Sequence, residues 1–188
     1  MNKRIFLSLL ATVAILTAFA APAHALLSVS GHYAGFNGGK SGFGGELSLP
    51  LLPITIGATY IENTYTSIPS FGSFGGGSLT GAIIPIYASI KLGVPMIPIY
   101  AALEGGYTLG TATSGSTTLP IPGGVYYSVA GGYSMPITPG ISVWGQVGYS
   151  NLMIDLKSAV TAAGGSSALV TNLDFSGMTY KFGATLGL

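Results

Sequence analysis

One small group of polar side chains could carry chemistry in this sequence. His32 follows Ser30 at an alternate position, and Glu46 lies a short loop further along the chain. A serine, a histidine and a carboxylate are the groups of a nucleophilic hydrolase, in which the histidine activates the serine. Ser30 or Ser48, together with His32 and Glu46, is therefore one candidate catalytic set.

The same residues also have a structural interpretation. If Glu46 lies near His32 on a paired strand, and the last strand closes on the first, Lys181 approaches the same region. Lys91 and Glu104 form a second, diagonal pair across two later strands. We therefore predict a buried network in which Glu46 contacts Lys181 and His32, and Glu104 contacts Lys91. We favour this network over catalysis, because a charge in a narrow interior must be paired or hydrated.

Other kinds of site are excluded by composition. The chain has no cysteine, and its two histidines are His24 and His32, so we expect no metal site. The glycines form no nucleotide-binding fingerprint, because no glycine-rich turn leads into a helix. We expect no cofactor. With 6 basic and 5 acidic residues there is no basic stripe for nucleic acid.

The N-terminus has the pattern of a secretory signal peptide. Lys3 and Arg4 form a short basic region, residues 5–21 are uncharged, and Ala23-His24-Ala25 is a small-x-small cleavage site. We predict a signal peptide over 1–25 and a mature domain over 26–188. A retained membrane anchor is the alternative, and the shortness of the apolar run argues against it.

The mature chain is apolar and rich in strand-forming residues. Hydrophobic residues make up 48% of the chain and charged residues 6%, against roughly 25% charged in a typical soluble domain. The most helix-like apolar segment, 81–103, contains Pro85, Pro95 and Pro98, which would break a helix. Its other residues are largely β-branched or aromatic, so we interpret it as two strands and a turn.

A repeated unit sets the number of strands. Pro-x-x-Pro turns occur at 50–53, 95–98 and 136–139, each between two strand-like arms. Three such hairpins, one strand before them and one after them predict eight strands. The expected ranges are 26–36, 42–50, 54–63, 80–92, 98–109, 123–135, 140–152 and 169–188. Glycine-, serine- and threonine-rich loops are expected at 37–41, 64–79, 110–122 and 157–168.

The alternation of side chains predicts which face meets lipid. In 98–109 one face carries Leu103 and Tyr107, and the other carries Ala102 and Glu104. An apolar face of this kind, opposite a small polar one, fits a sheet with lipid outside and a crowded interior. A sheet in lipid cannot leave open edges, so the expected fold is all-β, a closed eight-stranded antiparallel up-and-down barrel. The predicted aromatic girdle comprises Tyr60, Tyr107 and Tyr149.

This pattern resembles the small eight-stranded outer-membrane β-barrels of the OmpA-barrel and OmpX type. The resemblance covers the whole mature chain and implies an outer-membrane location, with the Pro-x-x-Pro turns periplasmic and the polar loops extracellular. It also implies that the last strand, ending Tyr180-Lys-Phe-Gly-Ala-Thr-Leu-Gly-Leu188, carries the signal for the barrel-insertion machinery. The chain departs from the family in ending on Leu188 rather than on an aromatic residue.

A predicted outer-membrane β-barrel of this size could have three functions. The favoured one is a monomeric structural or surface-interaction barrel, surrounded by outer-membrane lipid, that displays loops without catalysis; the sequence identifies no extracellular partner. The second is a narrow pore for small solutes, which bilayer conductance would detect. The third is a lipid-modifying hydrolase, which an assay on lipid A with His32→Ala as control would detect.

Overall fold

The structure is a computed structural model that describes residues 27–49, 53–68, 77–94, 97–114, 117–121, 123–154 and 173–188. The predicted signal peptide over 1–25 lies outside the described residues, as does the expected loop at 157–168. No helix in the described part of the chain is long and apolar enough to cross a membrane.

The described chain is almost entirely β-strand, as its β-branched and aromatic content predicts. A short 3-10 turn, η1 (Asn37–Gly39), joins the first two strands, with Gly38 and Gly39 at positive φ. The strands are β1 (Ser28–Phe36), β2 (Lys40–Leu49), β3 (Ile54–Ile68), β4 (Gly77–Gly93), β5 (Ile99–Ser114), β6 (Thr117–Ile121), β7 (Val125–Thr138), β8 (Ile141–Ile154), β9 (Leu173–Asp174) and β10 (Gly177–Gly187).

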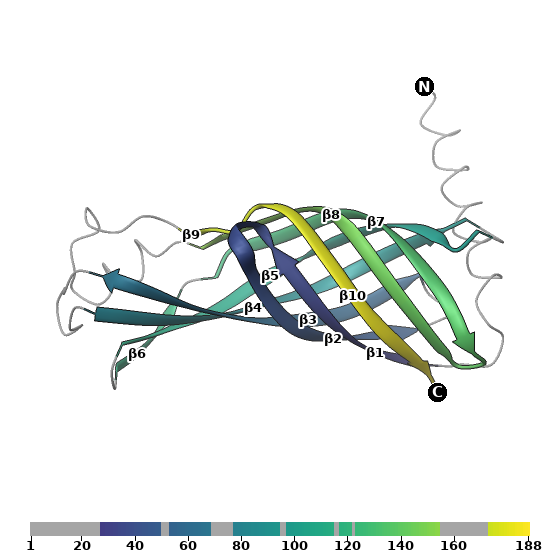
Figure 1. The fold of residues 1–188 in the computed structure, drawn as a ribbon, viewed down its shortest axis with the longest axis horizontal. Helices are drawn as coiled ribbons and strands as arrows, with labels where there is room; N and C mark the ends of the chain where they lie inside the picture. The colour runs from purple at the N-terminus through teal and green to yellow at the C-terminus, as the bar shows by residue number, and fades with distance from the viewer. Residues whose placement is uncertain are drawn as a thin grey trace, which may run out of the picture.

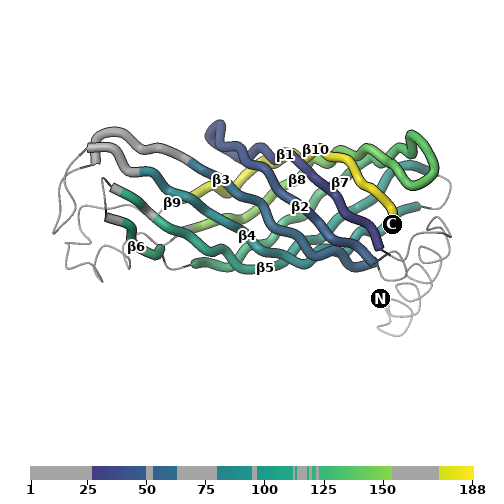
Figure 2. Tube along the Cα trace, turned by 90° about the horizontal axis from the view of Figure 1, so that it is seen from below, coloured from purple at the N-terminus to yellow at the C-terminus, as the bar shows by residue number. Residues whose placement is uncertain are grey.

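Eight of these strands close into a ring. The neighbours run β10, β1, β2, β3, β4, β5, β7, β8, and β8 pairs back onto β10. Every pairing is antiparallel, and each long strand lies beside the next one along the chain. Figures 1 and 2 show the strands winding obliquely around one axis. The predicted closed eight-stranded up-and-down barrel is confirmed.

The register fixes the stagger of the barrel. We follow paired residues once around the ring, starting at Gly187 of β10, and the path returns to β10 at Gly177, ten positions earlier. A stagger of ten over eight strands shifts the level by slightly more than one residue at each strand, which tilts the strands against the axis. The path runs through Ser28, Ser48, Thr55, Ser89, Glu104, Ser128 and Ser150.

The strand ends that adjoin the three predicted proline turns lie, with the C-terminus, at one end of the barrel, called here the turn end. Pro53 and Pro98 directly precede β3 and β5, where a missing N–H removes no ladder hydrogen bond. Pro136 is different, because β7 runs past its predicted end at 135 to Thr138. The register shifts between Pro136 and Thr138, and this bulge accommodates the proline.

The opposite, loop end is uneven in height. Pairing of β2 with β3 stops at Gly42 and Ile61, whereas β3 and β4 stay paired as far as Ile68 and Gly77. Figure 1 shows this hairpin extending beyond the β1–β2 turn. The loops predicted at 64–79 and 110–122 are therefore partly wrong, because 64–68, 77–79, 110–114 and 117–121 are strand, and β6 pairs with β5. Threonine-rich segments continue a ladder once a neighbouring strand holds them.

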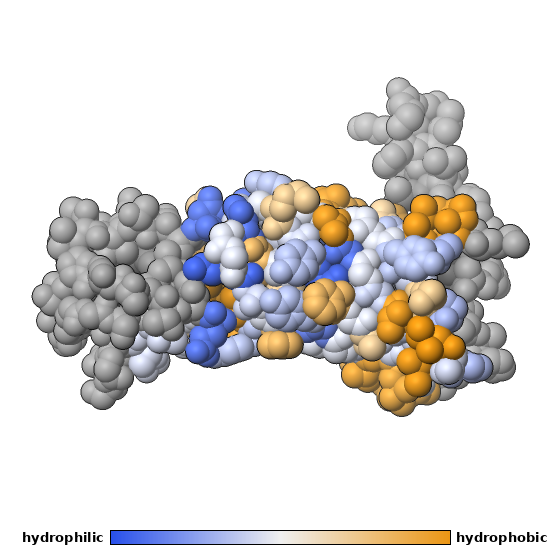
Figure 3. Space-filling view, viewed as in Figure 1, coloured by the Kyte–Doolittle hydropathy of each residue, from blue (hydrophilic) through white to orange (hydrophobic). Residues whose placement is uncertain are grey.

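The outer face of the barrel is apolar and the inner face is polar. Leu103 is 49% exposed, whereas its neighbour Ala102 is fully buried. The same alternation runs along β7 and β10. Figure 3 shows hydrophobic residues gathered on the half toward the turn end and hydrophilic ones toward the loop end. A water-soluble barrel would have the reverse distribution, so the face that the sequence assigns to lipid is the outer one.

Candidate functional site in the barrel lumen

The first ion pair in the lumen joins Lys181 of β10 to Glu104 of β5. The ammonium lies 2.7 Å from each carboxylate oxygen. The hydroxyl of Tyr126 donates to Glu104 Oε2 at 2.6 Å, and the amide of Gln146 donates to Oε1 at 3.0 Å. Both charged groups are buried, so these donors replace the water that the carboxylate loses.

The second ion pair joins Lys91 of β4 to Glu46 of β2. Lys91 Nζ lies 2.6 Å from Oε2, and the Tyr87 hydroxyl donates to Oε1 at 3.1 Å. The ammonium also lies 4.6 Å from the ring centre of Trp144 and 5.9 Å from that of Tyr100. Lys91 is thus held by one carboxylate and two aromatic faces.

These two pairs correct the predicted network. The sequence placed Lys181 with Glu46 and Lys91 with Glu104, but the partners are exchanged. The stagger explains why. Across three strand pairings the register leads from Glu104 to Gly177 of β10. Because the strands are tilted, the residue of β10 at the same height as Glu104 lies about four positions further along, which is Lys181. A prediction based only on which strands are neighbours leaves this shift in height out, and so it assigns the wrong partners.

His32 lies in the lumen but does not form the predicted contact with Glu46. Its Nε2 is 2.9 Å from the hydroxyl of Thr59, and its ring lies 5.9 Å from that of Trp144. Its Nδ1 has no hydrogen-bond partner among the described residues. In register His32 faces Gly44, and it is Ser30 that faces Glu46.

The candidate catalytic set is not assembled. The hydroxyl of Ser30 bonds Thr185 at 2.7 Å, and that of Ser48 bonds Thr55 at 2.9 Å. Neither serine is paired with His32, and Glu46 is engaged by Lys91 and Tyr87. A hydrolytic triad needs the histidine between the nucleophile and the carboxylate, and these contacts do not provide that order.

The large lumenal rings lie opposite glycines on neighbouring strands. Tyr87 pairs in register with Gly57, and a Cβ on that glycine would lie 2.7 Å from the tyrosine ring. The rings need this space because the interior of an eight-stranded barrel is narrow. The other such pairs are His32 with Gly44, Tyr100 with Gly132, and Trp144 with Gly183.

The two ends of the lumen differ in polarity. Toward the turn end the wall carries hydroxyls, including the bonded pairs Ser30–Thr185 and Ser48–Thr55. Toward the loop end buried apolar side chains gather, and the hydroxyls of Thr108 and Ser150 are buried beside them. Phe175 enters this region from the segment between β9 and β10, where its N–H bonds the carbonyl of Leu152. The apolar closure comprises Phe36, Ile61, Ile83, Ile121, Leu152 and Phe175.

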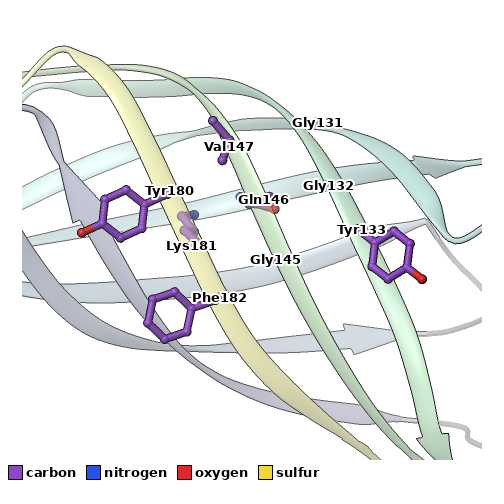
Figure 4. Close-up of a pocket in the computed structure, with 9 residues that line it drawn as sticks. All are labelled: Gly131, Gly132, Tyr133, Gly145, Gln146, Val147, Tyr180, Lys181 and Phe182. Carbon is purple, nitrogen blue, oxygen red and sulfur yellow. The ribbon is translucent and has the colours of Figure 1, made fainter.

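Aromatic side chains encircle the outer face. Tyr60, Tyr107 and Tyr149, named from the sequence, are all exposed there. Tyr33 and Phe43 continue the row in register with Tyr60. With the stagger included, Tyr127 and Tyr180 lie close to the same level. Figure 4 shows part of this face, where Tyr133, Tyr180 and Phe182 surround a shallow depression floored by Gly131 and Gly145.

Several lumenal partners were missed by sequence reasoning. Tyr87, Tyr126 and Gln146 each bond a buried carboxylate, and Thr59 bonds His32. Each lies at an inward position by simple alternation, which is the signal that could have found them. Alternation does not give their partners. Tyr126 meets Glu104 diagonally from the neighbouring strand, and the other three contacts join strands that are not neighbours. Within the described ranges no group of three potential metal ligands comes together.

Comparisons with known proteins rest on structure. No protein-family model and no curated protein sequence matches the chain. Neisserial surface protein A shares 14% identity, with 86% of this chain and 95% of that chain covered and a TM-score of 0.47. The N-terminal β-barrel domain of Pseudomonas aeruginosa OprF shares 9% identity, with 86% of this chain and 96% of that chain covered and a TM-score of 0.48. Ail of Yersinia pestis, in complex with the heparin analogue sucrose octasulfate, shares 11% identity, with 86% of this chain and 97% of that chain covered and a TM-score of 0.49.

The fold assignment follows from the chain's own geometry. Eight long strands close in antiparallel register with a stagger of ten. The apolar side chains lie outside, and the charged pairs lie inside. By these features the chain is a small, closed, eight-stranded antiparallel up-and-down β-barrel with an apolar outer face and charged pairs in its lumen.

Proposed function

We propose that this protein is an outer-membrane barrel that acts as a structural or surface-interaction scaffold and catalyses no reaction. The observation that carries the proposal is the inverted distribution of side chains. Leucine, isoleucine, valine and tyrosine cover the outside, whereas Glu46, Glu104 and Lys181 are buried inside. Such an exterior is stable in hydrocarbon and would aggregate in water.

A filled lumen supports a scaffold rather than a pore. The side chains of Tyr87 and Tyr126 are buried at the level of the ion pairs, and the apolar closure lies above them. An ion that crossed would have to displace both layers. The outer loops, rather than the interior, are then the part available for interaction. The paired β3–β4 and β5–β6 segments lengthen the barrel wall at that end.

The route to this location is part of the proposal. Residues 1–25 direct export and are removed, and the C-terminal strand is recognised by the barrel-insertion machinery. In support, β10 forms the closing seam with β1, and the N–H of Leu188 bonds the carbonyl of Leu27. The barrel acts as a monomer in outer-membrane lipid.

Heat-modifiability of the mature protein tests the membrane assignment. Detergent-folded protein is run on a gel with and without boiling, and its circular dichroism is recorded. We expect the unboiled sample to migrate differently and to be β-rich. The same mobility in both samples, together with solubility in plain buffer, would show that the outer face does not meet lipid.

Conductance and lipid assays test the non-catalytic scaffold. In planar bilayers we expect no resolved conductance steps, because the lumen is filled. Lipid A incubated with the protein should stay unmodified, and His32→Ala should behave like the parent. Regular ion-selective steps would favour the pore, and lipid deacylation that is lost in His32→Ala would favour the hydrolase.

A further inference from the structure

The surroundings of the Lys91 ammonium have the composition of an ammonium-recognition site. Glu46 supplies a carboxylate oxygen at 2.6 Å, and the faces of Trp144 and Tyr100 lie 4.6 and 5.9 Å away. A carboxylate combined with aromatic faces is the arrangement that binds alkylammonium ions. These groups come from β2, β8 and β5, and Lys91 comes from β4.

The three receptor groups are positioned without help from Lys91. Glu46 is held by the Tyr87 hydroxyl. Trp144 lies over Gly183 and packs near the ring of His32. Tyr100 lies over Gly132, and its hydroxyl donates to Gln146 Oε1 at 3.3 Å. A site whose walls are fixed by other contacts binds its ligand with a smaller loss of conformational entropy.

The site is reached from one end of the barrel. The side chain of Lys91 is 25% exposed, whereas the Glu46 side chain beneath it is 0% exposed. Lys91 lies two residues before the end of β4, at the turn end, where the lumen wall carries hydroxyls. The other lumenal lysine, Lys181, is 3% exposed and has no comparable access.

We propose that Glu46, Trp144 and Tyr100 form a receptor for a primary alkylammonium group at the turn end of the lumen. In the wild-type protein the ammonium group of the Lys91 side chain occupies this site. When this side chain is absent, an external amine on a flexible aliphatic chain enters from the turn end and takes its place. The ligand class is set by charge, by hydrogen bonding to the carboxylate, and by the size of the space between the rings.

The test uses Lys91→Ala in the full mature barrel and methylammonium chloride as the probe. Trp144 is the only tryptophan of the chain, so its fluorescence reports binding directly. We expect a saturable change in emission, and a rise in the heat-modification midpoint of roughly 5–10 °C at saturation. Sodium chloride at equal ionic strength should give neither effect, and tetramethylammonium, which cannot donate a hydrogen bond, should give a smaller one.

Matched variants distinguish this site from a general salt effect. Adding Glu46→Gln to Lys91→Ala should abolish the methylammonium-dependent rise, and adding Trp144→Leu should reduce it. A rise of the same size with sodium chloride, or one that persists in Lys91→Ala/Glu46→Gln, would overturn the proposal.

A measurement on the unmodified barrel covers the case in which Lys91→Ala does not fold. NMR of the wild-type protein should show the Lys91 side-chain protons shifted upfield by the ring of Trp144, and this shift should disappear in Trp144→Leu. Lys91 should also resist reductive methylation in the wild type and become reactive in Trp144→Leu. Unshifted protons and rapid methylation in the wild type would show that the ammonium is not held between the rings.

Discussion

At the scale of single residues, Glu104 is the most fully engaged charge in the lumen. Its carboxylate accepts hydrogen bonds from Lys181, Tyr126 and Gln146. Glu104→Gln leaves Lys181 buried without a counter-charge. We expect this change to lower the free energy of unfolding by about 3–5 kcal/mol at neutral pH, measured by urea unfolding of the lipid-folded barrel.

The matched control removes both charges. In Glu104→Gln/Lys181→Met the uncompensated charge of Lys181 is gone and Glu46 keeps its partner Lys91, so the free energy of unfolding should return to within about 1–2 kcal/mol of wild type. Equal losses in the single and double variants would show that packing, rather than the ion pair, sets the effect.

Asp174, at the loop end, offers a second test at this scale. Two hydrogen bonds from Ser176 hold the pKa of the Asp174 carboxyl below its usual value. The larger effect comes from the Ser176 hydroxyl, and the second from its N–H, which lies 2.8 Å from Oδ1. Because the folded pKa is lowered, the contact stabilises this segment above the pKa of the unfolded chain. The stabilisation is lost as pH falls through the folded pKa. NMR titration should show the pKa of Asp174 moving back toward its usual value in Ser176→Ala; an unchanged titration would contradict the assignment.

At the scale of the strand, β7 carries two adjacent glycines with opposite roles. A Cβ on Gly131 would point outward into open space, whereas a Cβ on Gly132 would meet the ring of Tyr100. Gly131→Ala should be neutral or stabilise the barrel by up to about 1 kcal/mol. Gly132→Ala should destabilise it by roughly 1–3 kcal/mol. Urea unfolding of both variants measures the difference.

The ring of Tyr100 provides the control for this comparison. If the clash is the cause, Gly132→Ala should be much less harmful when combined with Tyr100→Ala than when introduced alone. Equal sensitivity at Gly131 and Gly132 would mean that the two faces of β7 are not as described.

At the scale of the whole molecule, the barrel separates an apolar exterior from a polar interior. Leu103 faces outward near mid-height, and its neighbour Ala102 faces inward. Leu103→Arg should cost about 2–4 kcal/mol, because it places a charge in the lipid-facing band. Ala102→Ser should cost under about 1 kcal/mol, since the lumen already holds hydroxyls. Unfolding in lipid vesicles checks both, and equal tolerance of the two changes would reverse the assigned faces.

The sequence determines much of this architecture by itself. Alternation along each strand distinguishes the inward Glu104 and Lys181 from the outward Leu103 and Tyr107, because the side-chain period of a strand is two. The proline turns divide the chain into eight strands, and an apolar outer face requires the sheet to close. The inward positions of His32, Glu46 and Lys91 follow from the same alternation.

Only the tertiary structure decided which lumenal groups meet. Lys181 bonds Glu104 across the barrel, and Lys91 bonds Glu46 rather than the Glu104 of the next strand. These partners depend on the stagger of ten, which accumulates around the whole ring and appears in no single hairpin. The ends of β3, β4 and β5 also escaped prediction, because a neighbouring strand prolongs the ladder beyond what local propensity indicates. Alternation is a local property of the chain, whereas stagger is a property of the closed barrel.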